Sequence, residues 1–204
     1  MDISDKIIGR LSQYRRLLSM IAETGQSNIY SHQIASFVKI SSAQVRRDIM
    51  NIGYTGNPNN GYNIKDLAES IGSFIDDAEP QFAALVGVGN LGKAIIDYFS
   101  GRRPKLSIAA SFDSDPQKQS RVIHGCRCYS LEEFDEVVRD KNITIGIIAV
   151  PTADAQKTAD MLIKAGVKGL LNFAPVPLHV HSTIYIEDID ITMSLEKVAY
   201  FARQ

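Results

Sequence analysis

The sequence predicts an α/β protein that begins with a winged helix-turn-helix domain, continues as a Rossmann-type parallel sheet domain and ends in a separate helix. Three observations predict this fold class. Three short helical segments and a turn-rich loop open the chain, a glycine triplet follows an apolar run at residues 82–92, and strand and helix patterns alternate after residue 80. We expect domains at residues 1–78 and 79–191 and a terminal helix at 192–204.

The first domain is predicted from helical spacing and turn residues. Ser41 followed three places later by Gln44 has the spacing of a capping box, which predicts a short helix there. Glycine, proline and asparagine fill residues 56–61 between Tyr54 and Tyr62, which indicates a hairpin of the kind that forms a wing. The other helices are expected at residues 7–21, after Ser31 and at about 64–75.

Charge is unevenly distributed along a chain whose net charge is −1. Residues 10–65 carry an excess of arginine and lysine, which suggests that this part meets a polyanion. Arginine commonly reads guanine and glutamine can read adenine, although arginines on a helix can also simply line a solvated face. We favour contact with double-stranded DNA through Arg10, Ser41, Ser42, Gln44, Arg46 and Arg47.

The second domain is predicted from alternating segments whose strands are apolar on both faces, as in a parallel sheet covered by helices. Strands are expected at residues 82–88, 105–113, 143–151, 167–175 and 183–191, with a further extended piece at 121–129. Helices are expected at residues 90–99, 130–140, 152–166 and 194–204, the second of them opened by a capping box of Ser130 and Glu133.

The glycine triplet has the spacing and the context of a dinucleotide-binding loop. Gly87 permits a tight turn, Gly89 lets the backbone approach a pyrophosphate, and Gly92 lets the next helix pack closely. Asp113 ends the next strand at the distance typical of a ribose ligand, and no arginine follows it immediately to hold a 2′-phosphate. NADH or NAD⁺ is therefore favoured over NADP(H) as the cofactor.

Residues at two later strand ends complete the predicted cofactor site. We expect Val150, Pro151 and Phe173 to form part of an apolar pocket, because a neutral dihydronicotinamide tolerates such a pocket better than the cationic ring does. The expected cofactor-binding residues are Gly87, Val88, Gly89, Asn90, Leu91, Gly92, Asp113, Val150, Pro151, Thr152, Asn172 and Phe173.

A small NAD-dependent oxidoreductase is the main alternative. Such an enzyme needs a substrate pocket and a proton donor near the nicotinamide, but the alternating units use nearly all residues after Asp76. The histidines stand beside no motif that would orient them, so we expect no catalytic residue. A winged-helix regulator that senses another nucleotide is a second alternative.

Several other classes of site are not expected. Cys126 and Cys128 are too few for a closed zinc site and would be strained as a disulfide, so they are predicted to be packed thiols, and no metal is expected. No apolar run is long enough to cross a membrane, and the first residues lack the layout of a secretion signal. A cytoplasmic location without a membrane partner is expected.

Several segments together resemble the Rex family of redox-sensing transcriptional repressors. They are SSAQVRRDIMNIG, GVGNLGKAIIDYF, FDSDP, IIAVPTADAQKTADMLIKAG and VKGLLNFAPVPL, and the resemblance extends from about Arg10 to Phe201. The resemblance implies a homodimer with a swapped C-terminal helix that binds an inverted repeat in DNA and releases it when NADH binds. It also implies a switch network of Arg16, Tyr98 and Asp190, all of which are present.

Two positions depart from the family pattern. The predicted wing, GNPNNG, carries no arginine or lysine between its glycines, which places its contact with DNA in question. Ile52 stands where the family usually has an aromatic residue. Neither position belongs to the cofactor motif.

Overall fold

A computed structural model describes residues 4–103 and 105–203 and divides the chain into two compact units, Met1–Ala78 and Glu79–Gln204. Residues 1–3 and 204 of the predicted domain ranges lie outside the described residues. Each unit has its own apolar core.

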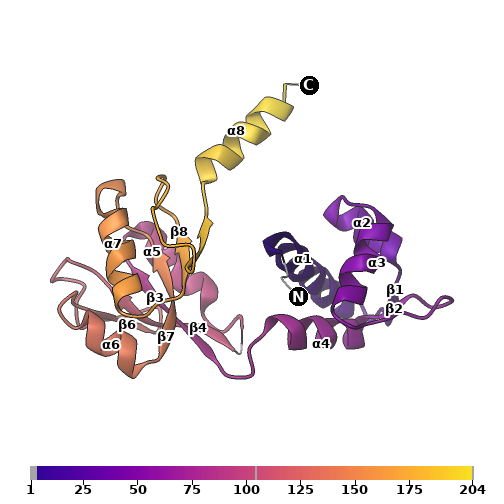
Figure 1. The fold of residues 1–204 in the computed structure, drawn as a ribbon, viewed down its shortest axis with the longest axis horizontal. Helices are drawn as coiled ribbons and strands as arrows, with labels where there is room; N and C mark the ends of the chain where they lie inside the picture. Colours follow the sequence, from indigo (N-terminus) through magenta and orange to yellow (C-terminus); the bar gives the residue numbers. More distant parts are fainter. Residues whose placement is uncertain (1–3, 104, 204) are drawn as a thin grey trace. The chain divides into compact units, whose positions relative to one another are not determined.

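The first unit is built from four helices and one short pair of strands (Figure 1). Leu11 and Leu18 of the first helix, Ile34 of the second, Ile49 of the third and Leu67 of the fourth share one buried cluster, which fixes the third helix against the rest. The elements are α1 (Asp5–Ala22), β1 (Asn28–Ile29), α2 (Ser31–Val38), α3 (Ser42–Asn51), β2 (Tyr62–Asn63) and α4 (Ile64–Ile75).

The wing differs from the predicted hairpin. β2 pairs antiparallel with β1, in the register Asn28 to Asn63, and Tyr54 lies outside any strand. The loop itself is closed by a bridge between Asn57 and Gly61. The side-chain oxygen of Asn57 accepts a hydrogen bond from the N–H of Asn59 at 2.8 Å, so the turn residues close a tighter loop than two flanking strands would.

The second unit is a seven-stranded sheet with helices on both faces (Figure 1). Six strands are parallel, and β5 pairs antiparallel with β6. The strands are β3 (Gln81–Val86), β4 (Leu106–Phe112), β5 (Val122–Ile123), β6 (Cys126–Tyr129), β7 (Ile143–Ile148), β8 (Gly169–Asn172) and β9 (Tyr185–Asp188). The helices are α5 (Asn90–Phe99), α6 (Phe134–Asp140), α7 (Thr152–Lys164) and α8 (Ile191–Phe201).

The order of the strands creates the site. It runs β5-β6-β4-β3-β7-β8-β9, so successive parallel strands extend in one direction from β3 and then in the other from β7. This is the Rossmann order, in which the crevice for ligands opens at the carboxyl ends of the two central strands. Side chains of β3 belong to the apolar clusters on both faces of the sheet. Ala84 and Val86 pack against α6 and α7 on one face, and Ala83 and Leu85 pack against α5 on the other.

Most strands are shorter than predicted, and three elements differ from the prediction in ways that have a local basis or change an element's start. Residues 121–129 form a β5–β6 hairpin, because His124 and Gly125 both have positive φ angles. α6 begins at Phe134 and not at residue 130: the Glu133 carboxylate accepts from the N–H of Ser130, as in a capping box, but the Ser130 hydroxyl donates to the same carboxylate at 2.9 Å and is not the cap acceptor. α8 begins three residues before the predicted start.

Candidate functional site

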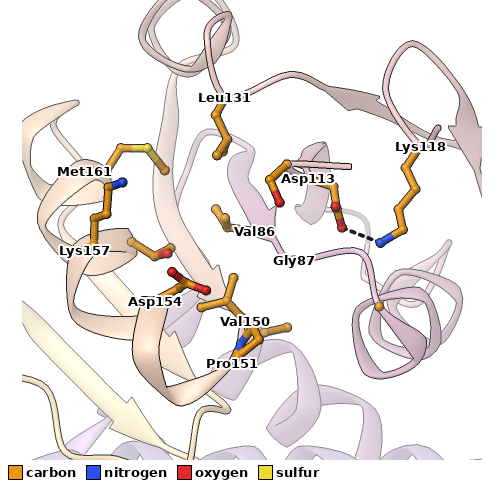
Figure 2. A pocket seen from close by; sticks show the side chains of 14 residues that line it. Val86, Gly87, Asp113, Lys118, Leu131, Val150, Pro151, Asp154, Lys157 and Met161 are labelled. Carbon is orange, nitrogen blue, oxygen red and sulfur yellow. Dashed lines mark hydrogen bonds and ion pairs between the residues drawn. The ribbon is translucent and has the colours of Figure 1, made fainter. Parts of the chain in front are cut away.

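A cavity of about 440 Å³ opens where β3 and β7 end (Figure 2). Gly87 follows β3 directly, and Ala149 and Val150 follow β7, so the strand order places these backbone segments side by side. The lining residues are Val86, Gly87, Gly89, Asp113, Ser114, Lys118, Leu131, Ala149, Val150, Pro151, Asp154, Lys157, Thr158 and Met161.

Each glycine of the triplet meets a different constraint. Gly87 has φ +97°, and a Cβ there would meet the carbonyl oxygen of Ala149 at 2.5 Å. A Cβ on Gly92 would collide with the carbonyl oxygen of Gly87, so α5 packs directly on the turn. Gly89 is the N-cap of α5, and a Cβ there would have no described atom within 4 Å. The open side of the loop is therefore at Gly89, where unpaired N–H groups at the start of α5 suit an anion.

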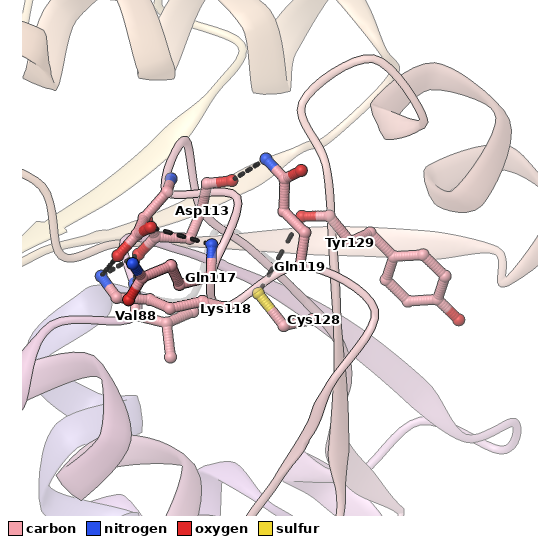
Figure 3. Close-up of polar contacts among 8 residues, drawn as sticks. Val88, Asp113, Gln117, Lys118, Gln119, Cys128 and Tyr129 are labelled. Carbon is pink, nitrogen blue, oxygen red and sulfur yellow. Dashed lines mark hydrogen bonds and ion pairs between the residues drawn. The ribbon is translucent and has the colours of Figure 1, made fainter.

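Asp113 fastens the glycine loop to the end of β4 (Figure 3). Its Oδ2 accepts a hydrogen bond from the N–H of Val88 at 2.7 Å and forms an ion pair with Lys118 Nζ at 3.0 Å. Its Oδ1 accepts a hydrogen bond from the N–H of Asp115 at 2.8 Å. Burial would raise the pKa of Asp113, but these donors outweigh it and hold the pKa below its ordinary value. The side chain is therefore an anion that positions the loop.

The remaining lining combines apolar walls with a few polar groups. Leu131 and Met161 lie at one end of the cavity and Val150 and Pro151 at the other (Figure 2). Asp154, Lys157 and Thr158 come from the first turns of α7. Apolar walls with few polar groups are typical of a pocket that binds a small molecule or cofactor.

The cavity contains part of the predicted cofactor set. Gly87, Gly89, Asp113, Val150 and Pro151 line it. Nine lining residues were not predicted: loops bring Ser114, Lys118 and Leu131 among them to the crevice, and the others include Asp154, Lys157, Thr158 and Met161 of α7. The predicted residues outside the lining are Val88, Asn90, Leu91, Gly92, Thr152, Asn172 and Phe173.

Asn172 has a structural task of its own. It is 1% exposed; its Nδ2 donates to the carbonyl oxygen of Val176 and to Asp188 Oδ1, and its Oδ1 accepts from the N–H of Ala174. The side chain thus ties β8 to β9 and to the loop after β8.

The third helix of the first unit presents both arginines of the motif to solvent. Arg46 and Arg47 are exposed, and Ser41 caps the helix by accepting a hydrogen bond from the N–H of Gln44 at 3.2 Å. Arg46 Nη1 donates to Ser31 Oγ at 3.1 Å, beside a hollow of about 380 Å³ between α3 and the wing. Arg46 therefore brings positive charge to the side of a wing that lacks arginine and lysine.

Arg10 is engaged inside the unit. Its Nε and Nη2 donate to Asp48 at 2.6 and 2.8 Å, and the Asp48 side chain is fully buried. The hydrogen bonds to Asp48 raise the pKa of Arg10. Two of the three guanidinium nitrogens of Arg10 thus serve the fold, and Arg10 tethers α1 to α3 in the present arrangement.

Family comparisons match both units. Residues 2–49 match a family model described as "Putative DNA-binding protein N-terminus", and residues 79–176 match one described as "CoA binding domain". The redox-sensing transcriptional repressor Rex of Carboxydothermus hydrogenoformans is 38% identical over 202 residues, which cover 99% of this chain and 97% of that protein. The chain belongs to the Rex family. The Rex repressor of Desulforamulus reducens is 37% identical over 198 residues, covering 97% of this chain and 94% of the relative.

Solved structures of a Rex-family repressor named RSP share the fold over nearly the whole chain. The structure of RSP with β-NAD⁺ and operator DNA aligns with a TM-score of 0.88 and 28% identity, covering 99% of this chain and 93% of that one. The structure of RSP with β-NADH aligns with the same TM-score and identity and covers 95% of that chain. These alignments confirm the fold class predicted from the sequence, which is a winged helix-turn-helix unit followed by a Rossmann-type sheet.

Of the three residues that the Rex-family resemblance assigns to a switch, Tyr98 and Asp190 have local partners within their own unit. Tyr98 is 55% exposed on α5, with the guanidinium carbon of Arg102 at 4.0 Å from its ring centroid. Asp190 is the N-cap of α8, where its Oδ1 accepts from the N–H of Met193 at 2.9 Å. Arg16 is exposed on α1. Arg16 and Tyr98 are thus exposed, and Asp190 is partly exposed.

Cys126, Cys128 and His124 lie outside the lining of the cavity at the glycine loop. Cys126 and Cys128 are buried free thiols, and burial raises the pKa of both, so they are packed. His124 Nδ1 lies 3.1 Å from Asp97 Oδ1. Within residues 4–103 and 105–203 no cluster of three or more histidine, cysteine or acidic side chains is arranged to hold a metal ion. Across the same residues, every helix is too short or too polar to span a membrane.

Proposed function

We propose that this chain is a transcriptional repressor that senses the ratio of NADH to NAD⁺, binds an inverted-repeat operator and releases it when NADH binds. The observation that carries the proposal is the presence of two sites in one chain: an arginine-bearing recognition helix and a Rossmann crevice with an open glycine loop. Membership of the Rex family, whose relative RSP was solved with operator DNA and with NADH, supports the same assignment.

DNA contact is assigned to α3 and to the residues around it. Ser41 and Ser42 lie at the N-terminus of α3, where N–H groups suit a phosphate, and Arg46 and Arg47 extend from the exposed face of the helix. Arg10, whose Nε and Nη2 donate hydrogen bonds to Asp48 of α3, is assigned a further contact with DNA at this surface.

Cofactor binding is assigned to the crevice between β3 and β7. The pyrophosphate lies on the open side of Gly89, the adenosine ribose lies near Asp113, and Val150 and Pro151 contact the apolar parts. The Asp113 carboxylate holds the Lys118 ammonium in an ion pair and would itself repel a 2′-phosphate, which favours NADH over NADPH.

Switching requires that NADH bind one arrangement of the repressor better than the other. Moving a two-state equilibrium from 1:99 to 99:1 takes about 5.5 kcal/mol of differential binding. A neutral dihydronicotinamide suits an apolar wall better than the cationic ring does, which gives NADH the greater preference. Arg16, Tyr98 and Asp190 carry the change, and Asp190 exchanges its partner when it does.

A homodimer supplies the partner that α8 needs. Leu195, Val198 and Phe201 are each about two thirds exposed, and α8 buries none of its side chains within the chain. A swapped α8 covers this apolar stripe with a second copy of the chain. The repressor acts in the cytoplasm, where the operator is.

Operator binding at fixed salt, titrated with NADH and then with NAD⁺, tests the proposal. Loss of the complex at NADH concentrations where NAD⁺ leaves it intact is the expected result. DNA binding that responds to neither dinucleotide, but to another nucleotide, would indicate a different signal. The repressor that we propose is not an enzyme. No DNA binding, together with NADH turnover on added carbonyl substrates, would therefore establish a small oxidoreductase in its place.

A further inference from the structure

The Asp48 carboxylate accepts hydrogen bonds from donors on two helices. Arg10 Nε and the Tyr14 hydroxyl donate to Oδ2 at 2.6 and 2.7 Å, while Arg10 Nη2 and Gln44 Nε2 donate to Oδ1, each at 2.8 Å. Burial would raise the pKa of Asp48, but these hydrogen bonds hold the pKa below its ordinary value. The group is thus a buried anion whose partners are all donors.

This anion fixes which way the Gln44 amide faces. Gln44 lies one helical turn before Asp48 on α3, and an anion accepts only the NH₂ end of an amide. The Gln44 carbonyl oxygen is therefore turned away from Asp48. It accepts a hydrogen bond from Arg47 Nη2 at 3.1 Å.

Both polar ends of Gln44 are thus engaged along the helix. Reading an adenine would require its NH₂ and carbonyl groups to face one base edge together. The exposed guanidinium of Arg47, in contrast, is held on one side by Gln44, and among the described residues its other nitrogens have no hydrogen-bond partner. A guanidinium has the planar donor pattern that matches the two acceptors of guanine.

We propose that Asp48, Gln44 and Arg47 form a relay in which Gln44 is a positioning residue and Arg47 reads a guanine. The buried Asp48 sets the amide of Gln44, and the amide sets the plane of the Arg47 guanidinium before DNA arrives. The inference rests on the proposed function, and it differs from the sequence-based expectation that Gln44 reads adenine.

The experiment measures binding to a library of duplexes in which one operator half-site is randomised, at fixed salt. Four proteins are compared: wild type, Gln44→Met, Arg47→Ala and the double variant. Gln44→Met keeps the length and helix propensity of the side chain and removes both hydrogen bonds, while Arg10 and Tyr14 still satisfy Asp48. Gln13→Met, at an exposed glutamine of α1, is the matched control.

The relay predicts that Gln44→Met and Arg47→Ala relax the same G·C base pair. Gln44→Met is expected to lower the preference for that pair by about tenfold, with unchanged affinity for random duplex, since Arg47 keeps its charge. The double variant is expected to match Arg47→Ala at that pair.

Two kinds of result would overturn the relay. If Gln44→Met relaxes an A·T pair, or no pair, Gln44 does not act through Arg47, and if Arg47→Ala weakens all sequences equally, Arg47 contacts only phosphate. A wild-type protein that binds no duplex, or binds every sequence alike, would overturn the proposed function and the relay together. Thermal melting of each variant shows whether the first unit stays folded.

Discussion

Gly89 and Gly92 allow the dinucleotide assignment to be tested against simple misfolding. Gly89 is the N-cap of α5 with extended backbone angles, φ −76° and ψ −164°, and a Cβ there would point into open space. Serine is at least as good an N-cap as glycine. Gly89→Ser is therefore expected to change the free energy of unfolding by less than about 0.5 kcal/mol.

The same substitution should weaken NADH binding. Two added heavy atoms at Gly89 prevent the close approach of the pyrophosphate to the backbone N–H groups. Each hydrogen bond to a charged group is worth about 1.5–3 kcal/mol, so the loss of one weakens binding by roughly tenfold to a hundredfold.

Gly92→Ala is the contrasting variant. Its Cβ would collide with the carbonyl oxygen of Gly87, which is backbone and cannot rotate away. Overpacking of this kind costs about 1–3 kcal/mol, so both the stability and the NADH affinity should fall.

Calorimetric NADH titration and urea unfolding measure the two quantities separately. The reasoning is refuted if the Gly89→Ser protein binds NADH as tightly as the wild type. It is also refuted if Gly92→Ala leaves the stability unchanged, because the close packing of α5 on the turn would then be incorrect.

Three further outcomes are expected. Asp113→Asn should weaken NADH binding and narrow the preference for NADH over NADPH, measured by competition, because Lys118 loses its anionic partner; an unchanged preference would contradict the role of the carboxylate. Since hydrogen bonds lower the pKa of Asp48 in the folded state, its contribution to stability is present above the ordinary pKa of about 3.9 and is lost as the pH falls through the folded value. Acid melting curves should show this loss, and Asp48→Ala should cost about 3–5 kcal/mol because it leaves Arg10 uncompensated; a loss below 1 kcal/mol would count against the network. Val198→Asp should convert the dimer to monomer in sedimentation while the Rossmann unit stays folded, and a variant that remains dimeric would show that α8 is not the interface.

The local features of the site could be predicted from the sequence because adjacent residues produce them. Spacing along the sequence alone predicts the glycine triplet, Asp113 at the end of a strand, and the alternation of strands and helices. The Ser41 cap belongs to the same class, since it closes over three residues.

Contacts between distant segments could not be predicted in this way. The Arg10–Asp48 ion pair joins α1 to α3, and nothing in the spacing showed that Arg10 would have this partner. Asn172 had the appearance of a cofactor ligand at a strand end, but its partners are at Val176 and Asp188. Lys118 reaches Asp113 through a loop whose path the sequence pattern does not define.

The terminal helix has a thermodynamic consequence. α8 has 11 residues, and isolated helices shorter than about 12–15 residues are marginal in water. Because its side chains are exposed within the chain, contact with another surface must stabilise its helical form. In the proposed homodimer, the folding of this segment and the assembly of the two chains are one equilibrium, which depends on protein concentration. The rate of protease cleavage within α8 would report the fraction of chains whose α8 is not covered. That fraction would fall as the concentration of the protein rises.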